Sequence, residues 1–183
     1  LRAGCAAEYR WPCPRRCPSH RSRARSASAP AWSPDGQKIA FAKSANGDTE
    51  LFIYDLATGQ TRQLTRSGAI DTEPTWSPNG REIVFTSDRG GQPQLYRMDT
   101  DGGGIQRLTY EGSSNQRADF APDGKSITYI QKSGNGFRVA VMDLETNNVR
   151  ILSDGPQDDS PAFAPNGQAV LYARQSGRNA LSL

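Results

Sequence analysis

Several short polar stretches carry residue types that could perform chemistry. The motif SPDG at residues 33–36 sets a serine hydroxyl beside an aspartate, as a catalytic or metal-binding loop could, and the stretch Asp99-Thr100-Asp101-Gly102 begins like a calcium loop. A Ser-His-Asp or Cys-His site needs an imidazole base, but the only histidine, His20, lies far from both motifs, and no G-x-S-x-G sequence is present. The calcium pattern lacks its later ligands and its closing glutamate. We therefore predict no catalytic residues and no metal site, and expect a hairpin turn at Asp101-Gly102.

The SPDG motif occurs four times at nearly constant spacing. Its prolines are Pro34, Pro78, Pro122 and Pro165, which are 44, 44 and 43 residues apart. The third motif position alternates between carboxylate and amide, as Asp35, Asn79, Asp123 and Asn166. A reaction that needs an acid would not use both residue types, whereas a tight turn accepts either. The motif therefore predicts a repeated turn, and its period is that of a propeller blade.

Each repeat predicts four short antiparallel strands. Apolar and polar residues alternate in runs such as KIAFA and ELFIYDL, and turn-forming residues bound each run. One such sheet cannot bury both of its faces, so neighbouring repeats must stack around an axis. The predicted fold is all-β: a β-propeller of four-stranded antiparallel blades. Whole blades are expected at 29–67, 71–110 and 114–153, with a fourth beginning near 158, an incomplete set of about three and a half.

The first 28 residues differ in composition from the rest. Residues 1–28 contain Cys5, Cys13, Cys17 and His20, with seven arginines and one acid, a formal charge of +6. Because the whole chain is +3, residues 29–183 carry −3. The cysteine spacing is not a paired zinc framework, and no aromatic pattern for nucleic-acid stacking accompanies the arginines. We predict that 1–28 is a disordered or non-native leader and 29–183 a partial propeller, with no nucleic-acid partner and no membrane insertion.

The loops that precede the first strands differ from one repeat to the next. They are polar and occupy 70–74, 114–117 and 157–160. In a propeller these loops and those joining second to third strands share one rim, which we call the mouth rim; the SPDG motifs lie on the opposite one, the turn rim. The turns are alike in every repeat, whereas the loops on the opposite rim differ. This difference favours a partner-binding role for the mouth rim, although polar loops can also be merely solvated.

The repeats resemble the WD40-like (PD40) propellers of the TolB family. The resemblance rests on APAWSPDG, DTEPTWSPNG, FTSDRGGQPQLYRMDTDGGGIQRLTYEG, SNQRADFAPDGK and DDSPAFAPNG, in order over residues 29–183. It implies a six-bladed propeller with an export signal and an α/β amino-terminal domain, of which this chain would be a fragment. It also implies a periplasmic, non-enzymatic protein without cofactors, in the Tol-Pal system that maintains outer-membrane integrity and envelope constriction during cell division.

The resemblance also implies partners and a site. The expected partners are the peptidoglycan-associated lipoprotein Pal, other Tol proteins and some bacteriocins, at the propeller rim and channel mouth. Two residues, Thr72 and Glu73, match the family motif there. Position in the equivalent loops adds four more: Asn115, Gln116, Asp158 and Asp159.

Two other function classes are compatible with the sequence. The chain could be the propeller of a serine peptidase of the prolyl oligopeptidase type, in which case a G-x-S-x-G strand-turn-helix would follow downstream. It could also be a binding propeller for another ligand, because a fold does not fix a function.

Overall fold

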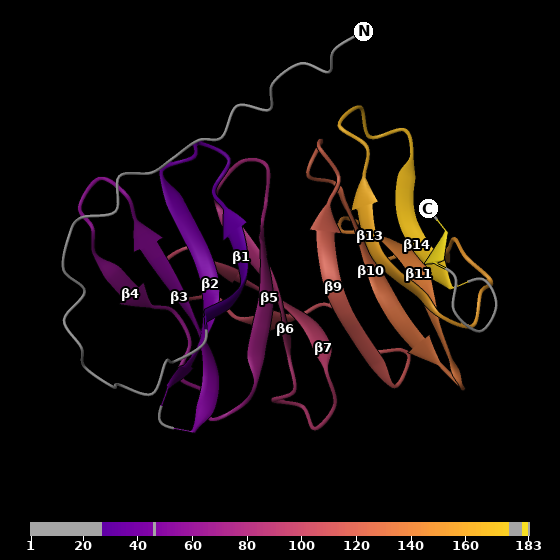
Figure 1. The fold of residues 1–183 in the computed structure, drawn as a ribbon, viewed down its shortest axis with the longest axis horizontal. Coiled ribbons are helices and arrows are strands. Elements are labelled where there is room, and N and C mark those ends of the chain that lie inside the picture. Colours follow the sequence, from indigo (N-terminus) through magenta and orange to yellow (C-terminus); the bar gives the residue numbers. More distant parts are fainter. Residues whose placement is uncertain (1–26, 46, 176–180, 183) are drawn as a thin grey trace, which may run out of the picture.

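The computed structural model describes residues 27–45, 47–175 and 181–182. Its strands form four antiparallel sheets, and within each sheet the spatial order of the strands is their order in the chain (Figure 1). Blade 1 comprises β1 (Ala27–Trp32), β2 (Lys38–Ala45), β3 (Asp48–Asp55) and β4 (Thr61–Gln63). Blade 2 comprises β5 (Asp71–Trp76), β6 (Glu82–Ser87), β7 (Gln94–Asp99) and β8 (Gln106–Arg107). Blade 3 comprises β9 (Ser114–Phe120), β10 (Ser126–Ser133), β11 (Gly136–Asp143) and β12 (Val149–Ile151). The fourth sheet comprises β13 (Asp158–Phe163), β14 (Val170–Gln175) and β15 (Leu181–Ser182).

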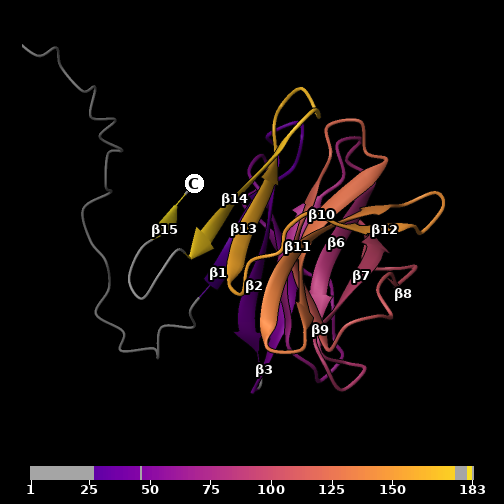
Figure 2. The ribbon, with the colours of Figure 1, turned by 90° about the vertical axis from the view of Figure 1, so that its right-hand side faces the viewer.

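The first strands of neighbouring blades are packed together. Contacts join β1 to β5, β5 to β9 and β9 to β13. In Figure 2, β1 and β13 lie toward one side of the molecule and the outer strands β8 and β12 toward the other. This arrangement confirms the predicted propeller, with the first strand of each blade innermost.

Apolar side chains fill the spaces between blades. Between blades 1 and 2, Leu51 and Ile53 pack with Ile83, Phe85 and others in one buried cluster. A second cluster joins blades 2 and 3: Val84, Leu95, Leu108, Phe120, Ile127, Tyr129, Ala140 and Met142. Burial of both sheet faces by stacking is the energetic reason that single repeats do not stand alone.

The four SPDG-type motifs adopt one turn geometry. The glycine of each is in the left-handed region, with φ between 67° and 72°: Gly36, Gly80, Gly124 and Gly167. The Oδ1 atoms of Asp35 and Asn79 accept the backbone N–H groups of Gln37 and Arg81, each at 3.0 Å. The carboxylate and the amide oxygen therefore accept the same backbone hydrogen bond, which confirms the turn interpretation.

The stretch that begins like a calcium loop is a hairpin turn between β7 and β8. Gly102 has φ 95°, and Asp101 Oδ1 accepts the Gly103 N–H at 2.9 Å. The guanidinium of Arg62, in blade 1, donates to the carbonyls of Thr100 and Asp101 at 2.9 and 2.7 Å. The oxygens of this turn thus hold the neighbouring blade.

The predicted leader falls almost wholly outside the described residues. Strand β1 begins at Ala27, two residues before the predicted start of the propeller at residue 29. The predictions for Cys5, Cys13, Cys17 and His20 lie outside the described residues, and the division at residue 28 stays a prediction.

Candidate functional site

The mouth rim brings the predicted loops together with their neighbours. The Ile70 N–H, before β5, donates to Asp88 Oδ1 in the β6–β7 loop at 2.8 Å. In the next blade the Asn115 N–H donates to the Pro93 carbonyl at 2.9 Å. These contacts place the starts of the first strands and the loops between second and third strands on one rim, as predicted. The prediction that the ranges on this rim are loops was wrong in part, because residues 71–74, 114–117 and 158–160 belong to β5, β9 and β13, which pair with the second strands.

Each first strand contains a residue in the left-handed region that is not glycine. These residues are Ala29, Glu73, Arg117 and Ser160, with φ values of 50°, 53°, 56° and 51°. Each lies at a shift in the pairing of the first strand with the second. Such backbone geometry costs of order 1–3 kcal/mol per residue for non-glycine side chains, and it is concentrated at functional sites. The bulge thus marks the same point of every blade at the mouth rim.

Glu73, Arg117 and Asp159 form a charged array across three blades. Arg117 Nε donates to Glu73 Oε1 at 3.1 Å, its backbone N–H donates to Glu73 Oε2 at 3.2 Å, and its Nη1 donates to Asp159 Oδ1. Hydrogen bonding to Asp159, and then to Glu73, raises the pKa of Arg117 further above its ordinary value. The side chains of Arg117 and Asp159 are 47% and 50% exposed, so the array faces solvent.

The array adjoins a cavity of about 410 Å³ between blade 3 and the fourth sheet. Gln116, whose Nε2 donates to Ser114 Oγ at 2.6 Å, lines it. Thr72 is half-buried and is paired with Thr86 across the strands. The full lining is Gln116, Arg117, Ile130, Phe137, Gln157, Asp158 and Asp159. A polar rim with an apolar wall and opposed charges can bind a protein side chain through directed hydrogen bonds.

Asn115 and Asp158 are buried, unlike the other predicted site residues. Both occupy the position of Asp71 in blade 2, and all three side chains are at most 1% exposed. Arg174 Nε donates to Asp158 Oδ1 at 3.0 Å. Burial is the largest single influence and raises the pKa of the Asp158 carboxyl, but the hydrogen bonds from Arg174, Ser153 and Gly155 and the charge of Arg174 together outweigh it, so the net pKa is lowered. Asn115 Nδ2 donates to Gln94 Oε1 and to the Glu111 carbonyl, each at 2.7 Å. In this structure these residues hold the loops of the rim in place.

Sequence reasoning did not single out the arginines of the rim. Arg117 joins the two acidic site residues, and Arg89 binds Asp71 Oδ2 at 2.9 Å beneath the same rim. Arg117 stood within the loop 114–117, and its equivalence to Glu73 in the repeat was the available signal. The sequence does not show that Glu73 and Arg117, at equivalent positions of two blades, would be in contact, because that contact depends on the angle between the blades.

Within the described ranges, no group of three or more His, Cys, Asp or Glu side chains is arranged to hold a metal ion. None of the described segments forms a helix with the length and apolar character to cross a membrane.

Comparison with known proteins identifies the family. The family PD40, TolB beta propeller domain, matches residues 19–183, which includes the strands described above. The chain belongs to the TolB beta propeller family. The match begins at residue 19, ahead of the boundary predicted at 28.

Individual TolB proteins support the assignment. Protein TolB homolog from Protochlamydia amoebophila is 51% identical over 51 residues, which are 28% of this chain and 11% of that protein. The crystal structure of TolB from Acinetobacter baumannii matches with a TM-score of 0.75 and 45% identity, covering 81% of this chain and 38% of that one. The chain therefore spans well under half the length of these TolB relatives.

More distant structures share the fold alone. Puromycin hydrolase, in its S511A mutant complexed with PGG, matches with a TM-score of 0.68 at 18% identity, covering 86% of this chain and 26% of that one. At this identity the likeness shows a common propeller architecture and says nothing about activity.

Proposed function

We propose that this propeller is a non-enzymatic binding module of the Tol-Pal system and that its mouth rim binds Pal. The observation that carries the proposal is the Glu73–Arg117–Asp159 array in a chain that belongs to the TolB family. Of the three residues, Glu73 matches the family motif, Asp159 was predicted from its place in an equivalent loop, and Arg117 joins the two. Other Tol proteins and some bacteriocins are further partners under this proposal. The protein would act in the periplasm, supporting outer-membrane integrity and envelope constriction during division.

The six predicted residues then divide into two roles. Thr72, Glu73, Gln116 and Asp159 are at least partly accessible and would contact the partner. Buried Asn115 and Asp158 would position the loops that carry those contacts. Glu73 is fixed by Thr86 Oγ1 at 3.0 Å and by Arg117, so its carboxylate is already ordered before binding, which lowers the entropic cost of association.

The test is calorimetric titration of soluble Pal into the complete protein, comparing wild type with Glu73→Ala. We expect at least a tenfold loss of affinity, equivalent to about 1.4 kcal/mol, because the array loses an ordered charge at the contact. Glu82→Ala is the matched control: Glu82 is a partly exposed glutamate of the same blade on the turn rim, near Arg97 at 3.9 Å. Equal affinities for wild type and Glu73→Ala, with both proteins folded by circular dichroism, would remove the site assignment.

The peptidase alternative predicts something different. A propeller accessory to a serine peptidase would be followed by a hydrolase domain with a G-x-S-x-G elbow. Puromycin hydrolase shares only the propeller architecture with this chain, and that likeness leaves the peptidase class open without favouring it over binding. Sequencing the coding region downstream of residue 183 discriminates between the two: a final short blade supports the TolB proposal, and an α/β-hydrolase pattern contradicts it.

A further inference from the structure

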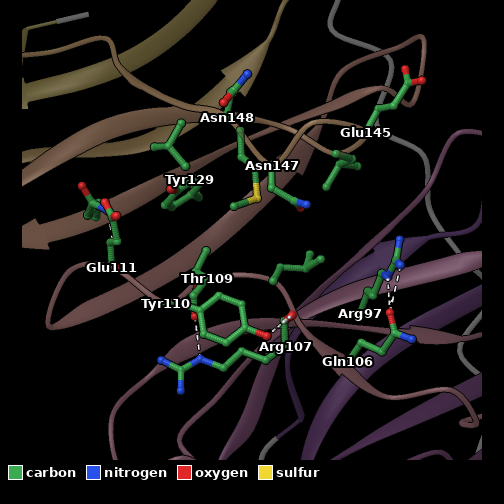
Figure 3. Close-up of a pocket in the computed structure, with 15 residues that line it drawn as sticks. Arg97, Gln106, Arg107, Thr109, Tyr110, Glu111, Tyr129, Glu145, Asn147 and Asn148 are labelled. Atoms are coloured by element: carbon green, nitrogen blue, oxygen red, sulfur yellow. Dashed lines mark hydrogen bonds between the residues drawn. The ribbon is translucent and has the colours of Figure 1, made fainter.

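A second cavity lies between blades 2 and 3 and shares no lining residue with the mouth-rim cavity. Its volume is about 760 Å³, within the range of small-molecule sites. Figure 3 shows Tyr110 and Arg107 on one side of it and Asn147 and Asn148, from the β11–β12 turn, on the other. We call this feature the side cleft. Its floor includes Tyr129, Met142 and Leu144.

The side cleft contains a large exposed aromatic ring that its neighbours hold in place. Tyr110 is 72% exposed. The Arg107 guanidinium lies 5.0 Å from the ring centroid, and the Tyr110 hydroxyl donates to the Arg107 carbonyl at 3.3 Å. Arg107 is itself fixed, because its Nε donates to the Thr109 carbonyl at 2.5 Å. The ring is therefore ordered in advance, with most of its surface open for stacking.

The opposite wall carries two exposed carboxamides, those of Asn147 and Asn148. No side-chain hydrogen bond is formed by Asn147 or Asn148 to any part of the chain that the structure describes. Each carboxamide can donate two hydrogen bonds and accept two. Burial, followed by the nearby charge of Glu111, raises the pKa of the Tyr129 phenol to about 12, so Tyr129 is a neutral hydroxyl at the cleft floor.

The charges that line the side cleft balance. Arg97 and Arg107 are matched by Glu111 and Glu145. A cleft for phosphate or nucleotide would carry an excess of positive charge, and one for a basic peptide an excess of negative charge. Ligands with neither charge are favoured, provided that they are rich in hydrogen-bonding groups.

We propose that the side cleft is a binding site for a neutral saccharide, with Tyr110 as the stacking platform and Asn147 and Asn148 as the hydroxyl-recognising groups. The apolar C–H face of a sugar ring covers the tyrosine, and its hydroxyls, which both donate and accept, pair with the carboxamides and with the Glu111 carboxylate. This inference is independent of Pal binding at the mouth rim.

The test is NMR titration of the complete protein with N,N′,N″-triacetylchitotriose, cellotriose and maltotriose, each to about 10 mM, a concentration at which a site with a millimolar dissociation constant is mostly occupied. We expect at least one to shift the amide resonances of residues 109–111 and 145–149. Tyr110→Ala should weaken that sugar at least tenfold, and Asn148→Ala should weaken it severalfold. Tyr54→Ala, which removes a partly exposed tyrosine of β3, is the matched control and should leave the affinity unchanged.

Three outcomes would overturn the proposal. They are no shifts with any of the three sugars, shifts that survive Tyr110→Ala undiminished, and binding of a sulfated trisaccharide in place of the neutral ones. Pal affinity, measured on the same Tyr110→Ala protein, should equal that of wild type, so the two proposals succeed or fail separately.

Discussion

The two rims of this propeller are built from equivalent positions of the same repeat but use them differently. On the turn rim, Asp35 and Asn79 make the same bonds to the backbone, and the turn glycines have nearly equal φ values. On the mouth rim, Glu73 and Arg117 share one backbone geometry and carry opposite charges that meet. On the turn rim, side chains at equivalent positions make the same hydrogen bonds, which indicates a structural role. On the mouth rim the backbone geometry repeats but the side chains differ, which is the pattern of the candidate site.

The turn rim also helps to join the blades. A Cβ placed on Gly124 would lie 3.6 Å from Pro78 Cδ, and one on Gly167 would lie 3.6 Å from Pro122 Cδ. Each turn thus packs beside the proline of the preceding blade. The mouth rim has its own structural layer beneath the charged array, formed by buried Asp71, Asn115 and Asp158.

The largest effect is expected from breaking that buried layer. Asp71→Ala should lower the free energy of unfolding by about 3 kcal/mol. The substitution removes the carboxylate that binds the Arg89 guanidinium and that accepts hydrogen bonds from the Ser87 and Ser67 hydroxyls. Asp159→Ala removes an exposed ion pair of the same rim and should cost about 1 kcal/mol or less. Urea unfolding of both variants measures the difference, and equal losses would refute the division into a buried layer and an exposed array.

A smaller effect is expected on the turn rim. Asn79→Ala removes the acceptor of the Arg81 N–H and of the Ser77 hydroxyl, at 3.0 and 2.8 Å, and should cost about 1 kcal/mol. Asn79→Asp keeps both bonds and should stay within about 0.5 kcal/mol of wild type at pH 7. The same unfolding assay decides the point: a large loss in Asn79→Asp would show that the two residue types are not interchangeable.

The smallest expected effect is a pH-dependent difference in stability between aspartate and asparagine at the turn position. The hydrogen bond from the Ser33 hydroxyl, followed by that from the Gln37 N–H, lowers the pKa of Asp35 below its ordinary value. Its stabilising contribution is therefore complete above the unfolded pKa, near pH 4, and is lost as pH falls through the lower native pKa. Asp35→Asn should match wild type at pH 7 and lose less stability between pH 4 and 2. Thermal melts of wild type and Asp35→Asn across this pH range measure the difference. An equal loss of stability in the two proteins would contradict the prediction.

Much of the architecture could be predicted because it depends on residues that are close together in the sequence. Strand alternation such as KIAFA depends on neighbouring residues, and the motif spacing predicted blades whose strands β2, β6, β10 and β14 begin at or shortly after each turn. The candidate site was predictable only in part. Thr72 and Glu73 came from the resemblance, but burial of Asn115 depends on Gln94 and Glu111, which neighbouring sequence does not place beside it.

The sequence by itself determined the repeat, the turn chemistry and the all-β class, since a four-residue turn and a period-2 pattern are fixed by backbone and side-chain preferences within a few residues. The tertiary structure alone decided which rim residues are accessible and which charges meet. Arg117 lies 44 positions from Glu73 and 42 from Asp159 along the chain, and only the stacking of blades around an axis brings the three within hydrogen-bonding distance. The side cleft has the same origin, because its two walls belong to different blades.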